Sequence, residues 1–262
     1  MSSPSFPRSP EDELTQSEVE RYDRQLRIAG FGRGSQLKLK RAKVAVVGAG
    51  GLGSAALLYL AAAGVGRIKV VDDGVVELSN LNRQILYTTE DIGRPKPEAA
   101  SRRLRELNPE IEIEPLQEKL TDENAEDLLK DVDLAIDCLD NFETRFILNR
   151  ACISNSKPLV HGAVYGLEGR LMTIIPRRSP CLACLIPRKP KEAAVVPVLG
   201  SLAGLVGALE ALEAVKLLAG LGSSTAGRLL VIDGYDLSFY WIDVRRDPSC
   251  PICGEKWWIE ER

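Results

Sequence analysis

Apolar and polar positions change rhythm at intervals along the first half of the chain. Short runs rich in valine, isoleucine and other apolar residues indicate buried strands at residues 44–47, 68–71, 111–115 and 132–137. Helices are indicated between these strands and after the last one, by helical spacing of apolar residues or by alanine-rich composition, at residues 54–63, 97–108, 123–130 and 142–155. Strands and helices that alternate in this way predict a parallel, doubly wound sheet with right-handed crossovers.

The second half follows a different pattern. Strand signals lie at residues 158–162, 169–175, 227–232 and 237–244, and a long helix is predicted at residues 202–218. Most of these strands have no helix between them, which favours antiparallel pairing. We therefore expect an α/β fold in which antiparallel strands extend the parallel N-terminal half of the sheet.

Residues 1–17 are rich in serine, proline and acidic side chains, which predicts a disordered N-terminal tail. A short amphipathic helix is expected from Glu18, followed by a glycine-rich break at residues 30–34. No linker long enough to separate a second domain follows, so we expect residues 18–262 to form a single domain.

Composition excludes several classes of protein. The net charge is −3 and the basic residues are dispersed, which argues against nucleic-acid binding. The N-terminus has no basic segment followed by an apolar core, so a cytoplasmic location is expected. One long uncharged run, residues 193–209, contains proline and glycines and is short for a membrane span. We interpret that run as a buried loop and helix, without membrane contact.

A glycine motif follows the first predicted strand. Gly48, Gly50 and Gly53 have the Gly-x-Gly-x-x-Gly spacing, and the first alanine-rich helix comes directly after them. The second predicted strand ends at Asp72, where a carboxylate can accept hydrogen bonds from ribose hydroxyls. This order predicts a nucleotide site in a Rossmann-like sheet.

The polar residues after Asp72 favour ATP over NAD. Arg83 follows Asn80 in a polar loop and can meet phosphates with two hydrogen bonds. Lys96 offers a second cation on a constrained loop, and Asp140 follows a central strand where a magnesium ligand would lie. Simpler interpretations stay open, since Lys96 could be a solvated loop charge and Asp140 could only cap the helix after it.

Three polar residues near Asp140 have ambiguous roles. Asp137 could be structural or could contribute to a metal site, and Arg145 could pair with Glu143 on the following helix. His161, the one histidine of the chain, lies in an apolar strand, where a histidine with satisfied hydrogen bonds is the expected state.

Four of the six cysteines form two Cys-x-x-Cys pairs, which predicts a closed tetrathiolate zinc site with a structural role. Its ligands would be Cys181, Cys184, Cys250 and Cys253. The other two, Cys138 and Cys152, lie in apolar segments and are expected to be buried packing thiols.

Several motifs in the same order resemble one family, the adenylyltransferases that activate ubiquitin-like proteins (the MoeB/ThiF/HesA group). Within it the chain is most similar to the molybdopterin-synthase sulfur-carrier adenylyltransferases. The matching segments are Arg21-Tyr22-Asp23-Arg24-Gln25, Gly48-x-Gly50-Gly51-Leu52-Gly53, Asp72, Ser79-Asn80-Leu81-x-Arg83-Gln84, Gly93-x-Pro95-Lys96, Asp137-Cys138-x-Asp140-Asn141 and the two cysteine pairs.

The resemblance implies a homodimer that adenylates the C-terminal Gly-Gly carboxylate of a ubiquitin-like or sulfur-carrier protein and releases pyrophosphate. It implies that Arg83 and Lys96 hold the phosphates of ATP and that Asp140 holds magnesium. It also implies that Arg24 reaches the nucleotide of the neighbouring subunit as an arginine finger. The remaining nucleotide contacts would come from Gly48, Gly50, Gly51, Gly53, Asp72, Asn80 and Gln84.

The chain departs from many relatives between residues 185 and 200, where those relatives carry a cysteine that bonds to the partner. No cysteine lies there in this sequence. We therefore expect the reaction to stop at the adenylate, which a separate sulfur donor or conjugation partner would consume. Other functions stay open: adenylation of a small carboxylate such as a modified tRNA nucleoside, a NAD-dependent oxidoreductase, or a non-catalytic nucleotide-binding subunit.

Overall fold

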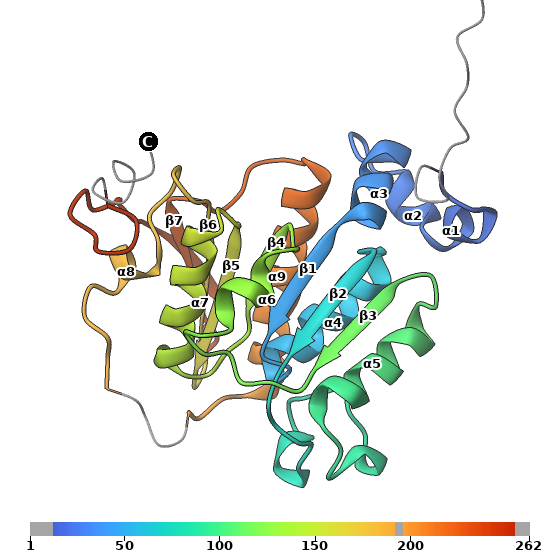
Figure 1. Ribbon diagram of the computed structural model, residues 1–262, viewed down its shortest axis with the longest axis horizontal. Coiled ribbons are helices and arrows are strands. Elements are labelled where there is room, and N and C mark those ends of the chain that lie inside the picture. The colour runs from blue at the N-terminus through green and yellow to red at the C-terminus, as the bar shows by residue number, and fades with distance from the viewer. Residues whose placement is uncertain (1–12, 192–195, 255–262) are drawn as a thin grey trace, which may run out of the picture.

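Eight strands form one sheet in the computed structural model, which describes residues 13–191 and 196–254 (Figure 1). The strand order is β3-β2-β1-β4-β5-β6-β7-β8. The first five strands along the chain pair in parallel, and they are β1 (Lys43–Val47), β2 (Arg67–Val71), β3 (Glu112–Leu116), β4 (Leu134–Asp137) and β5 (Leu159–Tyr165).

Three antiparallel strands continue the sheet beyond β5. They are β6 (Glu168–Ile174), β7 (Arg228–Asp233) and β8 (Ser238–Asp243). The predicted α/β class, with a parallel N-terminal half and an antiparallel extension, is confirmed.

Helices cover both faces of the sheet, and the burial of the central strands explains their continuous apolar runs. In β1, Val44 and Val46 belong to one buried cluster, while Ala45 and Val47 belong to the other. The first cluster includes residues of α3 (Gly32–Arg41), α4 (Gly51–Ala63), α5 (Lys96–Leu107) and α9 (Gly200–Ala219). The second includes residues of α6 (Ala125–Leu129), α7 (Phe142–Ser154) and α8 (Leu182–Leu185).

The glycine-rich break expected at residues 30–34 is present but ends earlier, because residues 30–31 form a turn and α3 begins at Gly32. Gly34 lies within the helix, where glycine costs about 1 kcal/mol relative to alanine. Tertiary contacts offset that cost, since Ser35 Oγ and Lys38 Nζ both donate to the carbonyl of Ala219 at the end of α9. These contacts join segments that are distant in sequence, so local sequence patterns could not predict them.

Close packing between α4 and α9 depends on Gly207. A Cβ atom at Gly207 would lie 2.2 Å from the carbonyl oxygen of Leu52, so a larger residue would force the two helices apart. At Gly204, by contrast, an added Cβ would meet nothing within 4 Å. The small residues of α9 therefore have an internal packing role at Gly207. No helix in the described part of the chain is long and apolar enough to cross a membrane.

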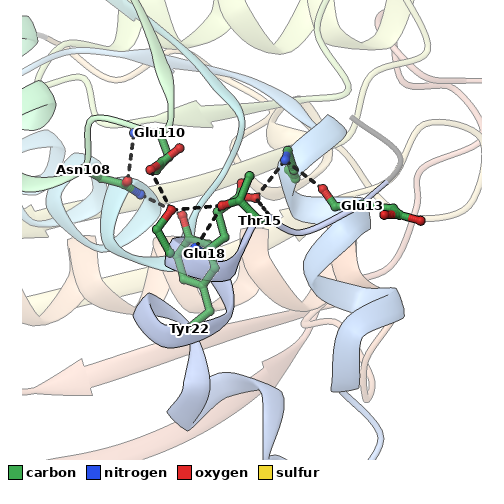
Figure 2. Close-up of polar contacts among 8 residues, drawn as sticks. Glu13, Thr15, Glu18, Tyr22, Asn108 and Glu110 are labelled. Carbon is green, nitrogen blue, oxygen red and sulfur yellow. Dashed lines mark hydrogen bonds and ion pairs between the residues drawn. The ribbon is translucent and has the colours of Figure 1, made fainter. Parts of the chain in front are cut away.

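A buried polar network attaches the first helices to the rest of the molecule (Figure 2). Thr15 caps α1 (Gln16–Arg21) in a capping box with Glu18, and Glu18 is 3% exposed. Lys40 Nζ lies 2.8 Å from the Glu18 carboxylate. Burial alone would raise the pKa of Glu18, but hydrogen bonds from Lys40 and Thr15 hold it below its usual value.

The chain is thus already helical at Gln16, before the boundary expected at residue 18. Residues 1–12, the rest of the segment expected to be disordered, lie outside the described residues. The amphipathic helix expected from Glu18 is divided at Tyr22, where α1 ends, and α2 (Asp23–Leu26) follows.

One buried carboxyl group, that of Glu210 on α9, contacts the end of β4. Glu210 is fully buried and accepts a hydrogen bond from Cys138 Sγ at 3.4 Å. Burial, together with the nearby Asp137 carboxylate, raises the pKa of Glu210 well above its ordinary value. The folded protein therefore favours the protonated form of Glu210.

A raised pKa in the folded state means that stability from Glu210 is complete below its unfolded pKa of about 4.3 and is lost as the pH rises. Glu210→Gln removes this loss. We expect the stability of the variant relative to wild type to increase by up to about 1.4 kcal/mol per pH unit, measured by urea unfolding between about pH 5.5 and pH 7.5.

The matched control is Glu213→Gln on the same helix, because Glu213 is buried but paired with Lys216. That change should destabilise the protein by breaking the pair. Equal pH dependence in wild type and Glu210→Gln would contradict the assignment of a protonated Glu210.

Candidate functional site

The glycine loop between β1 and α4 is shaped by contacts that exclude any side chain. Gly48 has a φ of +96°, and a Cβ atom there would lie 2.6 Å from the carbonyl oxygen of Cys138. At Gly53 an added Cβ would lie 2.1 Å from the carbonyl oxygen of Gly48. The loop therefore packs against the carboxyl end of β4, its neighbour in the sheet. β2 lies on the other side of β1, so the sheet extends from β1 in opposite directions toward β2 and toward β4. Nucleotides bind at such a switch point, outside the carboxyl ends of the strands.

Asp72, at the end of β2, is tied to this loop. Its two carboxylate oxygens accept hydrogen bonds from the N–H of Ala49 at 2.7 Å and the N–H of Gly74 at 2.8 Å. Each oxygen retains a further lone pair, so the half-buried carboxylate can still accept from ribose hydroxyls. The glycine loop and Asp72 fit a nucleoside phosphate.

Tyr87 also holds the loop, a role that sequence reasoning missed. Its hydroxyl donates to the carbonyl of Ala49 at 2.9 Å, and burial raises the pKa of Tyr87. Tyrosine in an apolar stretch gives no sequence signal for such a contact.

Arg83 and Gln84, two of the residues expected to bind the nucleotide, lie beside the glycine turn. A Cβ atom at Gly51 would lie 3.5 Å from Arg83 Cγ, and one at Gly50 would lie 3.8 Å from Gln84 Nε2. Arg83 Nη1 donates to the Ser79 carbonyl at 2.9 Å. Gln84 is buried and its Oε1 has no hydrogen-bond partner among the described residues.

Asn80 lies just before them but is mainly turned toward its own backbone. Its side chain is 6% exposed and accepts from the N–H of Glu77 at 3.2 Å, which stabilises η2 (Leu78–Asn80). The structure thus shows a local role for Asn80 in shaping the loop that carries Arg83.

Lys96 lies close to Asp72 in the structure, although the two residues are distant in sequence. A Cβ atom at Gly74 would lie 3.0 Å from Asp72 Oδ1 and 3.3 Å from Lys96 Nζ. The backbone explains this proximity, because the N–H of Lys96 donates to the carbonyl of Gly74 at 3.0 Å and Val75 pairs with Pro95. Lys96 is therefore held at the crevice by the first turn of α5.

Asp140 follows β4 and is exposed at the same end of the sheet. It does not cap α7, because the side chain of Asn141 accepts from the N–H of Thr144 at 2.9 Å and occupies that position. Asn141 Nδ2 lies 3.4 Å from Asp140 Oδ1. The carboxylate of Asp140 is thus accessible to a ligand in the crevice.

Asp137 has no access to the crevice, since its side chain is fully buried. It pairs with His161 Nδ1 at 2.6 Å and lies 3.9 Å from Arg145 Nε. Arg145 therefore turns to Asp137, and His161 has the satisfied buried environment that was expected.

Arg24 lies apart from all of these residues. It follows Tyr22, which packs on Gly64, the residue that ends α4, while α4 begins at the glycine loop. With 13 residues, α4 spans about 20 Å. Figure 1 shows the same separation, with α1, α2 and α3 grouped beyond the start of β1. Arg24 is exposed at the opposite end of the sheet from the crevice.

Four cysteine side chains converge between α8 and the segment after β8. The sulfur atoms of Cys181, Cys184, Cys250 and Cys253 all lie within 4.8 Å of one another. Two of the separations, Cys181 to Cys250 and Cys184 to Cys253, are 3.8 Å and 3.4 Å. A tetrahedral zinc ion with bonds of about 2.3 Å separates its sulfur ligands by about 3.8 Å.

These distances fit zinc and exclude disulfides, whose sulfur atoms are about 2.05 Å apart. A hydrogen bond from the Cys181 thiol lowers the pKa of Cys253 to about 5, which favours a thiolate ligand. The four-cysteine site predicted from sequence is therefore present, and four ligands leave no open position on the metal.

Cys138 and Cys152 are both buried, as expected of packing thiols. Burial raises the pKa of each thiol, which keeps both in the unreactive protonated form.

Loss of the zinc ligands should destabilise the antiparallel half of the sheet. We expect Cys250→Ser to lose bound zinc, measured by atomic emission, and to unfold at a lower temperature. Cys152→Ser is the matched control, since it changes a buried thiol outside the cluster and should keep its zinc. A Cys250→Ser protein with full zinc content would contradict this assignment.

Comparisons with known proteins agree with this geometry. The chain is 46% identical over 252 residues to a sulfur carrier protein adenylyltransferase of Thermus thermophilus, covering 92% of this chain and 93% of the relative. It is 42% identical over 247 residues to a SAMP-activating enzyme E1 of Haloferax volcanii, covering 92% and 91%. The crystal structure of E. coli MccB has the same fold, with a TM-score of 0.81 at 22% identity, over 90% of this chain and 72% of that one. The ThiF family model matches residues 22–252. The chain therefore belongs to the ThiF family and is an adenylyltransferase.

Proposed function

We propose that this enzyme adenylates the C-terminal Gly-Gly carboxylate of a ubiquitin-like or sulfur-carrier protein with MgATP. The observation that carries the proposal is the crevice itself, where Asp72, Arg83 and Lys96 surround a loop closed by Gly48 and Gly53. The names of the Thermus and Haloferax relatives, a sulfur carrier protein adenylyltransferase and a SAMP-activating enzyme E1, support this class of substrate.

The reaction requires charge stabilisation and positioning more than proton transfer. A C-terminal carboxylate has a pKa of about 3.5 and is ionised at neutral pH, so it needs no general base. One carboxylate oxygen bonds to the α-phosphorus of ATP while the bond to the bridging oxygen breaks and pyrophosphate leaves. Arg83 and Lys96 would stabilise the phosphate charge, and backbone N–H groups of the glycine loop would orient the phosphates.

Magnesium would be held by Asp140, whose exposed carboxylate is a hard oxygen ligand at the crevice. When bound, the ion neutralises phosphate charge and orients the leaving pyrophosphate. The buried Asp137 takes no direct part, because its carboxylate is enclosed by protein groups.

Arg24 would complete the site of a second subunit in a homodimer. Within one chain it lies about one α4 length, about 20 Å, from the glycine loop, so it cannot reach the nucleotide bound there. A two-fold dimer that brings α2 of one subunit to the crevice of the other would supply the missing cation.

The reaction would stop at the acyl adenylate. All six cysteines lie in the described residues, and four of them form the metal cluster. Cys138 and Cys152 are buried with raised pKa values, so neither is poised to attack an adenylate. A separate sulfur donor or conjugation partner would then take over the activated carrier.

The assay for this function is ATP–pyrophosphate exchange with and without a small carrier protein that ends in Gly-Gly. We expect exchange that depends on the carrier and is lost when its last glycine is removed. Carrier-independent exchange stimulated by a small carboxylate would contradict the proposed substrate. A carrier adduct released by reductant would contradict the proposal that the reaction stops at the adenylate.

The proposed role of Arg24 predicts that Arg24→Ala keeps ATP binding but loses about 10³-fold or more of the exchange rate, in the range of arginine fingers. Arg27→Ala is the control, since Arg27 lies on the same segment and pairs with Asp23. Normal exchange by Arg24→Ala would refute the assignment.

Mixing two inactive variants tests action between subunits. Arg24→Ala mixed with Asp140→Asn forms hybrid dimers in which one of the two sites has both residues intact. Random assortment should restore about a quarter of wild-type exchange. No recovery in mixtures that exchange subunits would contradict action across the dimer.

A further inference from the structure

Both backbone polar groups of Leu139, the residue before Asp140, are held by buried charged side chains. Its N–H donates to Asp137 Oδ1 at 3.2 Å, and its carbonyl accepts from Arg145 Nη2. Arg145 Nε also lies 3.9 Å from Asp137 Oδ1. The Asp137–Arg145 pair therefore fixes the peptide that leads directly into Asp140.

His161 holds the pair from the neighbouring strand. It is the register partner of Asp137 across β4 and β5, and its Nδ1 donates to Asp137 Oδ2 at 2.6 Å. The side chains of Asp137, Arg145 and His161 are no more than 7% exposed. Each is thus confined to one position by packing as well as by hydrogen bonds.

Electrostatic attraction also stabilises the arrangement of Asp137, Arg145 and His161. Burial alone would raise the pKa of Asp137, but Arg145 and His161 hold it below its usual value, so the carboxylate stays ionised. The other titratable groups nearby are the buried Glu210, Cys138 and Cys152, whose raised pKa values favour their neutral forms. Arg145 therefore balances the one ionised carboxylate at this position.

These contacts are not needed to start α7 or to join β4 to its neighbours. Asn141 already caps α7, and the backbones of β4 and β5 pair independently of Arg145. What Arg145 adds is a fixed conformation for the loop between β4 and α7. The same loop forms one wall of the glycine crevice, since an added Cβ at Gly48 would lie 3.2 Å from the Leu139 nitrogen.

We propose that Asp137, Arg145 and His161 are positioning residues that hold Asp140 at the place where it binds the magnesium ion of MgATP. The proposal rests on the proposed function, in which Asp140 is the magnesium ligand. It assigns a role to the only histidine of the sequence, through the carboxylate that it orients. Groups that orient metal ligands typically change metal affinity about 10–100-fold when they are altered.

The experiment measures binding, without turnover, of a non-hydrolysable ATP analogue by calorimetry over a range of magnesium concentrations. Arg145→Lys keeps the charge beside Asp137 but loses the planar fork that reaches both Asp137 and the Leu139 carbonyl. We expect unchanged analogue affinity in EDTA and an increase of about tenfold in the magnesium concentration that gives half of the full affinity gain.

Two further variants make the result decisive. His161→Phe should shift the magnesium dependence in the same direction, and it serves as the test if Arg145→Lys does not fold. Arg150→Lys, on α7 but paired with the exposed Asp122, is the control and should match wild type.

Asp140→Asn separates the two proposals. If it keeps the full magnesium effect, Asp140 is not the ligand and the proposed function is wrong on that point. If Asp140→Asn loses the effect while the folded Arg145→Lys and His161→Phe variants respond to magnesium as wild type does, the positioning proposal is overturned.

Discussion

The site depends on one steric constraint, the packing of Gly48 against the carbonyl of Cys138. This contact presses the turn after β1 onto the end of β4 and leaves no room for a side chain. Gly53 packs in turn on the carbonyl of Gly48, which sets the start of α4. The crevice can then collect groups from separate segments, with Asp72 and Lys96 on the β2 side and Asp140 on the β4 side. A nucleotide site forms because these strands end at the same edge of the sheet.

Two buried carboxyl groups near the end of β4, one on each face of the sheet, differ in their ionisation state. On one side, Cys138 contacts the neutral carboxyl of Glu210 from α9. On the other, Asp137 stays ionised between Arg145 and His161. The difference follows from the partners, because Asp137 pairs with Arg145 and His161, whereas the hydrogen-bond partner of Glu210 is the Cys138 thiol. The last residues of β4 thus link α9 and α7 to the loop that carries Asp140.

Much of this could be predicted from the sequence, because buried strands and the glycine motif have local signatures. The four zinc ligands were also recognisable from their spacing. Other features depend on long-range contacts: α3 forms despite Gly34 because its side chains reach the end of α9. The sequence likewise left Asp137 undecided, since its partner His161 lies on another strand. Arg24 illustrates the reverse case, because its motif was recognisable but its distance from the crevice became apparent only in the fold.

The central claim is that a carrier carboxylate attacks the α-phosphorus of ATP in this crevice. The direct measurement uses a Gly-Gly-ended carrier with ¹⁸O in its C-terminal carboxylate, with the adenylate cleaved by an added amine and the nucleotide analysed by mass spectrometry. Because the amine attacks the carbonyl carbon, the account predicts that one ¹⁸O atom appears in AMP and none in pyrophosphate. Formation of ADP and labelled inorganic phosphate would instead place the attack at the γ-phosphorus and contradict the account.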